Sequence, residues 1–70
     1  MSIVNDLTHR EHEILELVSQ GKSNKDIAAV LMIAEHTVEK HLSNIYPKLQ
    51  VGNRCKAAIW YLKTNNGNPV

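Results

Sequence analysis

The sequence predicts an all-α fold of four helices. Three observations support this: apolar residues recur at spacings of three and four, helix-capping residues precede the apolar runs, and no segment has the alternating pattern of a strand. The chain has 70 residues, of which 43% are hydrophobic. This length suits a single small domain, residues 1–70, with one core.

The first helix is expected over residues 9–20. Thr8 is a good N-cap, and Glu11 stands three residues later, as in a capping box. Gly21 is a plausible end to the helix. The apolar positions between them are Ile14, Leu15, Leu17 and Val18.

The second and third helices are expected over residues 24–31 and 35–48. Ser23 caps the second, whose inward stripe is Ile27, Ala28 and Leu31. The third has one apolar seam of Val38, Leu42, Ile45 and Leu49. Pro47 lacks a backbone donor and disfavours a helical conformation for the residue before it, so we expect the third helix to end early or kink there.

The fourth helix is expected over residues 54–64, after the Asn53 cap, and the tail 65–70 has the composition of turns and disorder. Trp60 and Tyr61 cannot both face inward together with Ala57 and Ala58. An aromatic left outside on so small a domain suits a dimer contact. The alternative, in which Trp60 covers the core, remains open.

The charges are distributed unevenly along the chain. Residues 1–39 hold seven acids and three bases, whereas residues 40–70 hold five bases and no acid, although the formal net charge is only +1. A basic half suggests an anionic partner, and chance imbalance is the alternative. The single cysteine fits a reducing compartment, and no apolar run is long enough to span a membrane, so we expect a cytoplasmic protein.

The second and third helices are separated by only about three residues, Met32–Ala34. This is the spacing of a helix-turn-helix, in which the first helix braces the second. The outer face of the second can then lie in the major groove of DNA, which admits one α-helix.

The segments "LTHREHEIL", "GKSNKDIAAVL" and "HTVEKHLSNIYPKLQVGNR" together resemble the LuxR-type (GerE-type) DNA-binding domain. The resemblance runs from about Leu7 to Leu62. It implies a tetra-helical helix-turn-helix fold and a bacterial transcription regulator that binds double-stranded DNA as a homodimer. Many members carry an additional receiver or ligand-binding domain, so the chain is expected to be a stand-alone member or the output domain of a response regulator.

The resemblance also implies roles for individual residues. The positions that read base edges correspond to Glu39, Lys40 and Ser43; lysine suits guanine, glutamate suits cytosine and serine suits either. Contacts to the DNA backbone are expected from Asn24, Lys25, Thr37, His41, Asn44, Lys48, Arg54 and Lys56. The dimer contact is expected from Ala58, Trp60 and Tyr61. Each of these polar residues has an alternative as ordinary solvated surface.

Three positions depart from the family pattern. Ala34 stands where a capping serine is frequent, Glu39 is acidic where many members are basic, and Pro47 replaces a usual basic residue. The first lowers helix stability, the second weakens phosphate attraction, and the third removes a charge. Together they leave the target sequence open.

Metal binding and catalysis have weak support. His9 and His12 share a helix face, but zinc needs three or four ligands, and the other histidines and Cys55 have no recognisable spacing. Cys55 is best explained as a replacement for a small hydroxyl residue. We therefore expect no enzyme activity, no cofactor, no membrane contact and no small-molecule ligand within this chain. The rival to DNA binding is a docking or anti-activator module that uses the fourth helix, with Trp60, Tyr61 and Leu62 as its working surface.

Overall fold

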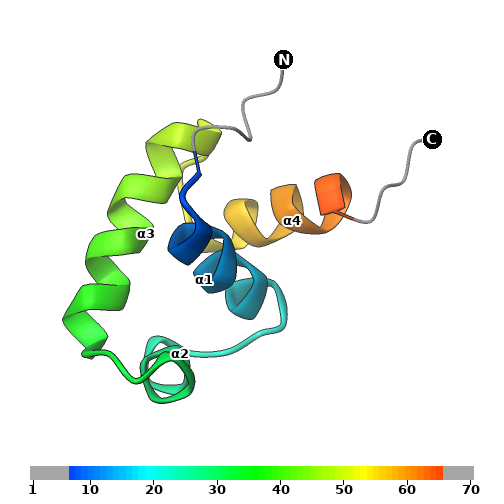
Figure 1. Cartoon of the computed structure of the whole chain (residues 1–70). Coiled ribbons are helices and arrows are strands. Elements are labelled where there is room, and N and C mark those ends of the chain that lie inside the picture. The colour runs from blue at the N-terminus through cyan, green and yellow to red at the C-terminus, as the bar shows by residue number, and fades with distance from the viewer. Residues whose placement is uncertain (1–6, 66–70) are drawn as a thin grey trace.

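The computed structural model describes residues 7–65 of the chain, and within this range every regular element is an α-helix. The helices are α1 (His9–Ser19), α2 (Asn24–Leu31), α3 (Glu35–Leu49) and α4 (Arg54–Asn65). In Figure 1, α1 lies between the long α3 and α4, and α2 lies beside the N-terminal end of α3, at the bottom of the view. The predicted all-α class is confirmed. Most of the tail expected over 65–70 lies outside the described residues, and Asn65 itself closes α4.

The core is a single cluster to which all four helices contribute. Its fully buried side chains include Ile14 and Leu15 of α1, Ile27 of α2, and Val38 and Ile45 of α3. These positions are the apolar seams seen in the sequence, which confirms the inward face of the first three helices. Burial of large aliphatic side chains provides most of the stabilisation of a domain this small.

The helix starts use the expected caps. The Thr8 hydroxyl accepts from the Glu11 amide at 3.1 Å, and the Glu11 carboxylate accepts from the Thr8 amide at 3.1 Å, which completes a capping box. The side chains of Ser23 and Asn53 accept from backbone amides three residues ahead in the same way. Ala34 leaves α3 with no side-chain cap, as the sequence indicated.

Two tight connections orient α2. Gly21 has φ +86°, a backbone conformation that suits glycine, and it ends α1. Met32 adopts a left-handed conformation at φ 59°, and Ile33 donates to the Ala28 carbonyl at 3.0 Å. Because this turn is so short, α2 must cross α3 and brace it.

Of the two alternatives expected at Pro47, an early end of α3 is wrong, because the helix continues to Leu49, whereas a kink stays a prediction. Proline removes the bond to the Ser43 carbonyl, but both residues are exposed, so water can replace that donor. Beyond the proline, Leu49 is buried, and the left-handed Gln50 closes the helix through its amide. Val51 adds a 3.0 Å bond to the Tyr46 carbonyl, so packing and a good C-cap outweigh the local cost of proline.

Candidate nucleic-acid interface

The outward face of α3 carries a strip of exposed polar side chains. Val38, Leu42, Ile45 and Leu49 are buried on the inner face. At 100° per residue, Lys40 points almost directly away from them, Ser43 lies to one side of it, and Glu39 lies further round on that side. We call Glu39, Lys40 and Ser43 the α3 strip. All three are exposed, so the fold brings the three expected base-reading residues together on one accessible surface.

The side chains of the α3 strip are not used inside the fold. Among residues 7–65, no side-chain hydrogen bond or ion pair involves Glu39, Lys40 or Ser43. An exposed polar group with no internal partner can bind an external one without breaking an existing bond. The strip therefore offers a donor, an acceptor and a hydroxyl that can be either.

The other edge of α3 holds three of the residues expected to contact the DNA backbone. Thr37, His41 and Asn44 lie on the side of Lys40 opposite to Glu39. Asn44 is exposed, whereas Thr37 and His41 are half-buried, so they are less accessible than a freely solvated residue. Hydroxyl, imidazole and amide groups suit phosphate oxygens, whereas the acidic edge around Glu39 repels them.

The start of α2 is tied to the start of α4 by Arg54. Its guanidinium donates to the Asn24 side-chain oxygen at 2.6 Å and also to the backbone carbonyl of Lys22. The bond from Arg54 uses the side-chain oxygen of Asn24, and within residues 7–65 its amide nitrogen donates to no other group. Lys25 and Lys56 are exposed beside this junction, whereas Arg54 is half-buried.

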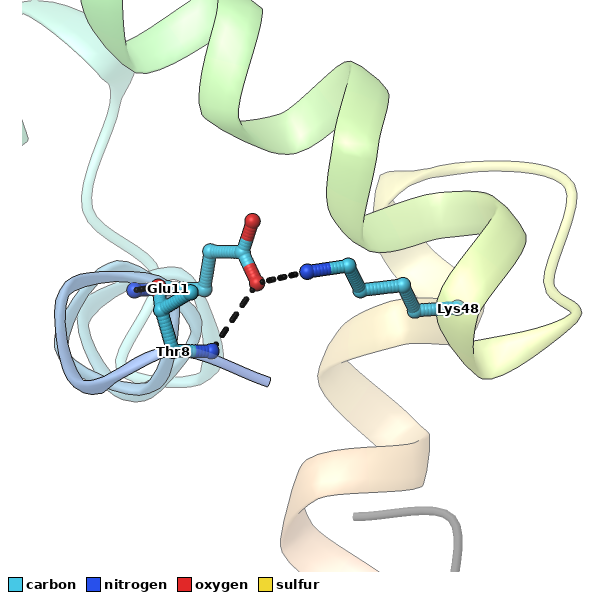
Figure 2. Close-up of polar contacts among 3 residues, drawn as sticks. All are labelled: Thr8, Glu11 and Lys48. Atoms are coloured by element: carbon cyan, nitrogen blue, oxygen red, sulfur yellow. Dashed lines mark hydrogen bonds and ion pairs between the residues drawn. The ribbon is translucent and has the colours of Figure 1, made fainter. Parts of the chain in front are cut away.

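Lys48 is held by an ion pair that the sequence did not reveal. Figure 2 shows its ammonium group against the Glu11 carboxylate, at 2.7 Å from Nζ to Oε1. The same Oε1 accepts the Thr8 amide at 3.1 Å. Glu11 is only 4% exposed although it is charged, so the capping residue of α1 also anchors the last turn of α3.

The pKa of Glu11 is shifted by this environment. Burial alone raises the pKa of the Glu11 carboxyl, but the hydrogen bonds from Lys48 and the Thr8 amide, with the charges of Lys48 and His41, lower it further than burial raises it. The net result is a pKa below its ordinary value. The folded protein therefore favours the ionised carboxylate and the closed ion pair.

The structure shows how far the aromatic residues of α4 are exposed: Tyr61 is buried and Trp60 is half-buried. Tyr61 is 6% exposed and belongs to the core, where its ring meets the edge of His12 at 5.5 Å between centroids, so it cannot line an exposed dimer contact. Burial, together with the charge of Glu16, raises the pKa of the Tyr61 phenol. Trp60 is half-buried and packs against the core, as does Ala58.

The exposed apolar residues of α4 are Ile59 and Leu62, each 47% accessible. Leu62 was expected from the sequence only as part of the docking alternative, and Ile59 was given no role, although their spacing from Cys55, of four and then three residues, could have identified a second stripe. Cys55 is also exposed. We call Cys55, Ile59 and Leu62 the α4 stripe.

Other kinds of site have no counterpart in the described part of the chain. Among residues 7–65, no three histidine, cysteine, aspartate or glutamate side chains gather as a metal site would require, and no pocket opens between the helices. None of the four described helices is long and apolar enough to cross a membrane. The accessible surfaces of interest are therefore the α3 strip, the α2–α4 junction and the α4 stripe.

Comparison with known proteins identifies a family and relatives that this chain resembles in sequence. The profile of the family described as "Bacterial regulatory proteins, luxR family" matches residues 5–61. The chain is 49% identical over 59 residues to the uncharacterized transcriptional regulatory protein YhcZ of Bacillus subtilis, covering 84% of this chain and 28% of that protein. It is 46% identical over 57 residues to the nitrate/nitrite response regulator protein NarL of Escherichia coli, covering 81% of this chain and 26% of that one.

A solved structure has the same arrangement of helices. The response regulator ChrA of a heme-sensing two-component system superposes with a TM-score of 0.79 at 46% sequence identity, over 84% of this chain and 29% of that chain. The chain spans 28% of the length of YhcZ and 26% of the length of NarL.

Proposed function

Since this chain belongs to the LuxR family of bacterial regulatory proteins, as the DNA-binding domain of a transcriptional regulator, we propose that it recognises a specific DNA sequence by laying α3 in the major groove. One observation carries the proposal: the α3 strip is exposed, polar and without polar side-chain partners among residues 7–65, on a helix braced by α2 through a short turn. A groove-reading helix needs such a face.

The three residues of the α3 strip supply complementary chemistry. The Lys40 ammonium suits the O6 and N7 acceptors of guanine, the Glu39 carboxylate suits the amino group of cytosine, and the Ser43 hydroxyl suits either. Glu39 also disfavours any approach that brings phosphate to its edge of α3. It therefore contributes to specificity by repulsion as well as by attraction.

Backbone contacts position the domain on the duplex. Lys25 and the amide nitrogen of Asn24 stand at the start of α2, where the helix dipole also favours an anion. Thr37, His41 and Asn44 extend the contact along α3, and Lys56 extends it at α4. Lys48 and Arg54 have internal partners, so we assign them a smaller share of the phosphate attraction than their charges alone suggest.

The α4 stripe is the surface we propose for pairing with a second copy on DNA. Ile59 and Leu62 provide exposed apolar area, and the half-buried Ala58 lies four residues before Leu62 on the same side of the helix. The half-buried Trp60 lies on another side of α4, so its expected part in the dimer contact stays a prediction. Two copies related by a two-fold axis would read two half-sites, and each would reinforce the binding of the other.

Selection of duplexes from a random library, followed by titration of the enriched duplex at several salt concentrations, tests the proposal. We expect one family of related sequences and a linear decrease of log affinity with log salt, because phosphate contacts release counterions. Failure to enrich any sequence, or binding that does not depend on salt, would refute it.

The alternative function is that of a docking module. The exposed apolar residues of α4 favour it, because such a stripe can contact another protein as well as a second copy. Substitution separates the two: changes in the α3 strip abolish function if the chain reads DNA, whereas changes in the α4 stripe do so if it only docks onto a protein partner.

A further inference from the structure

We propose that Glu11 and Lys48 are positioning residues for DNA reading. Their ion pair would hold the last turn of α3 on α1 and thereby aim Lys40 and Ser43 at the base edges. The inference rests on the proposed function. It assigns Lys48 a different role from the phosphate contact that its position in the family pattern implies.

The geometry of the pair favours a fixed contact over a fluctuating surface bridge. The Glu11 side chain is 5% accessible and that of Lys48 is 31%, so the contact is largely shielded from water. One carboxylate oxygen receives both the Lys48 ammonium and the Thr8 amide, while the Thr8 hydroxyl receives the Glu11 amide. The carboxylate is thus bound to the start of α1 as well as to Lys48, so the pair connects the last turn of α3 to the first turn of α1 (Figure 2).

An anchor at Lys48 should have a large effect on the orientation of α3, because both ends of this helix are weakened. Pro47 directly precedes it, so the last turn lacks one bond to the rest of the helix. The opposite end of α3 also lacks a side-chain cap, because Ala34 occupies that position. With both ends weakened, the orientation of α3 depends on packing and on this ion pair, which is its only described side-chain polar bond to another helix among residues 7–65.

A small movement of α3 at Lys48 also displaces the side chains of the α3 strip. Ser43 and Lys40 lie five and eight residues before Lys48 on the same helix, about 7.5 and 12 Å along its axis. Hydrogen bonds to base edges tolerate only a few tenths of an ångström, whereas charge attraction to phosphates changes slowly with distance. Loss of the anchor should therefore reduce discrimination between sequences more than overall affinity.

The test compares three variants on two duplexes. Lys48→Met removes the ammonium and keeps the length of the side chain, Lys48→Arg retains a cation that can reach Glu11, and Lys63→Met is the control, because Lys63 is exposed on α4. The probes are the duplex that the wild-type chain enriches from a random library and a scrambled duplex of the same composition. Affinities are compared at equal folded fraction, determined by circular dichroism.

We expect Lys48→Met to lower the ratio of specific to scrambled affinity by roughly 5- to 150-fold, the effect of one misread base pair. Affinity for the scrambled duplex and the slope of log affinity against log salt should change little, and Lys48→Arg should restore most of the ratio. An equal loss on both duplexes, with a slope smaller by about 0.9, would make Lys48 a phosphate contact and overturn the proposal. An unchanged ratio would also overturn it.

A second variant covers the case in which Lys48→Met does not fold. Glu11→Gln keeps an acceptor for the Thr8 amide but removes the negative charge, so the ratio should fall in the same direction by a smaller factor. Amide hydrogen exchange should also accelerate at Tyr46 and Leu49 in both Glu11→Gln and, where it folds, Lys48→Met. A Glu11→Gln chain with unchanged exchange and an unchanged ratio would refute the proposal.

The outcomes also separate this inference from the proposed function. A wild-type chain that enriches no sequence refutes DNA reading itself. A wild-type chain that enriches a sequence, together with a Lys48→Met chain that discriminates equally well, refutes only the positioning role of the ion pair.

Discussion

The outward faces of α3 and α4 differ in chemistry although both helices pack on α1. The face of α3 presents Glu39, Lys40 and Ser43, which have no polar partners among residues 7–65, whereas the face of α4 presents Ile59 and Leu62 at 47% accessibility. A polar face that forms no internal bonds suits base edges, and an exposed apolar one suits another protein surface. Under the proposed function, DNA reading and self-association therefore fall on two different helices.

The two helices are also attached to α1 in different ways. α4 is held by buried apolar contacts that include Ala57 and Tyr61, the latter against the edge of His12. α3 shares the same core but adds the ion pair between Lys48 and Glu11. Apolar packing is insensitive to pH and resists salt, whereas an ion pair depends on both, so the two attachments should respond differently to solution conditions.

The largest effect is expected from Lys40→Ala on the α3 face. Loss of a base contact should weaken binding to the enriched duplex by about 1–3 kcal/mol and leave binding to random DNA nearly unchanged. Lys63→Ala, on the exposed side of α4, is the control and should change neither. Fluorescence anisotropy on both duplexes measures the difference. Equal losses on the two duplexes would reduce Lys40 to a phosphate contact.

A change of similar size is expected from Pro47→Ala, which restores the missing helical donor of α3. The free energy of unfolding should rise by about 1–3 kcal/mol, because alanine is a far better helix residue and the site already has helical geometry. Urea titration followed by circular dichroism measures it. A loss of stability would contradict the continuous helix from Glu35 to Leu49.

A smaller effect is expected from replacing the apolar residues of the α4 face. Ile59→Ser combined with Leu62→Ser should weaken binding to a duplex with two half-sites by about 1 kcal/mol per residue, and leave binding to one half-site unchanged. Both side chains are about half exposed, so stability should change by only about 0.5 kcal/mol. Equal losses on the two duplexes would point to a direct role of α4 in DNA contact.

The pH dependence of stability should reveal the attachment of α3. Because the folded pKa of Glu11 lies below its ordinary value of 4.5, the ion pair contributes fully above that pH, and its contribution is lost as pH falls through the lower folded pKa. Urea titrations between neutral pH and pH about 3 should show this loss in the wild type and a shallower one in Lys48→Met. Identical profiles would contradict the stabilising role of the pair.

The smallest effect is expected from Lys25→Gln at the start of α2. Removal of one phosphate contact per copy should reduce the slope of log affinity against log salt by about 0.9, with little change in sequence preference. Lys48→Gln is the matched comparison, since its ammonium already has an internal partner. A larger slope change for Lys48 than for Lys25 would reverse the roles assigned to them.

Local sequence patterns predicted most of the fold because they depend on neighbouring residues. The Thr8–Glu11 box, the Ser23 cap and the α3 seam are all readable within a few positions of the chain. The exposed α3 strip followed from the same seam, since the residues opposite a buried stripe must face outward.

Contacts between distant residues could not be predicted in this way. Lys48 and Glu11 are separated by 37 residues, and Arg54 and Asn24 by 30, so no periodicity connects them. The same limit explains the error at Pro47, where buried Leu49 and the C-cap outweigh the local preference of proline. It also applies to Tyr61, which is buried in the core and contacts His12 of another helix.

A titration of the isotope-labelled chain with its enriched duplex, followed by amide chemical shifts, tests the central claim most directly. DNA reading through α3 predicts that the largest shifts occur at Lys40, Ser43 and Lys25, and that they appear at the first additions of duplex. Shifts confined to Ile59 and Leu62 of α4, with α3 unchanged, would contradict the claim and favour a docking module.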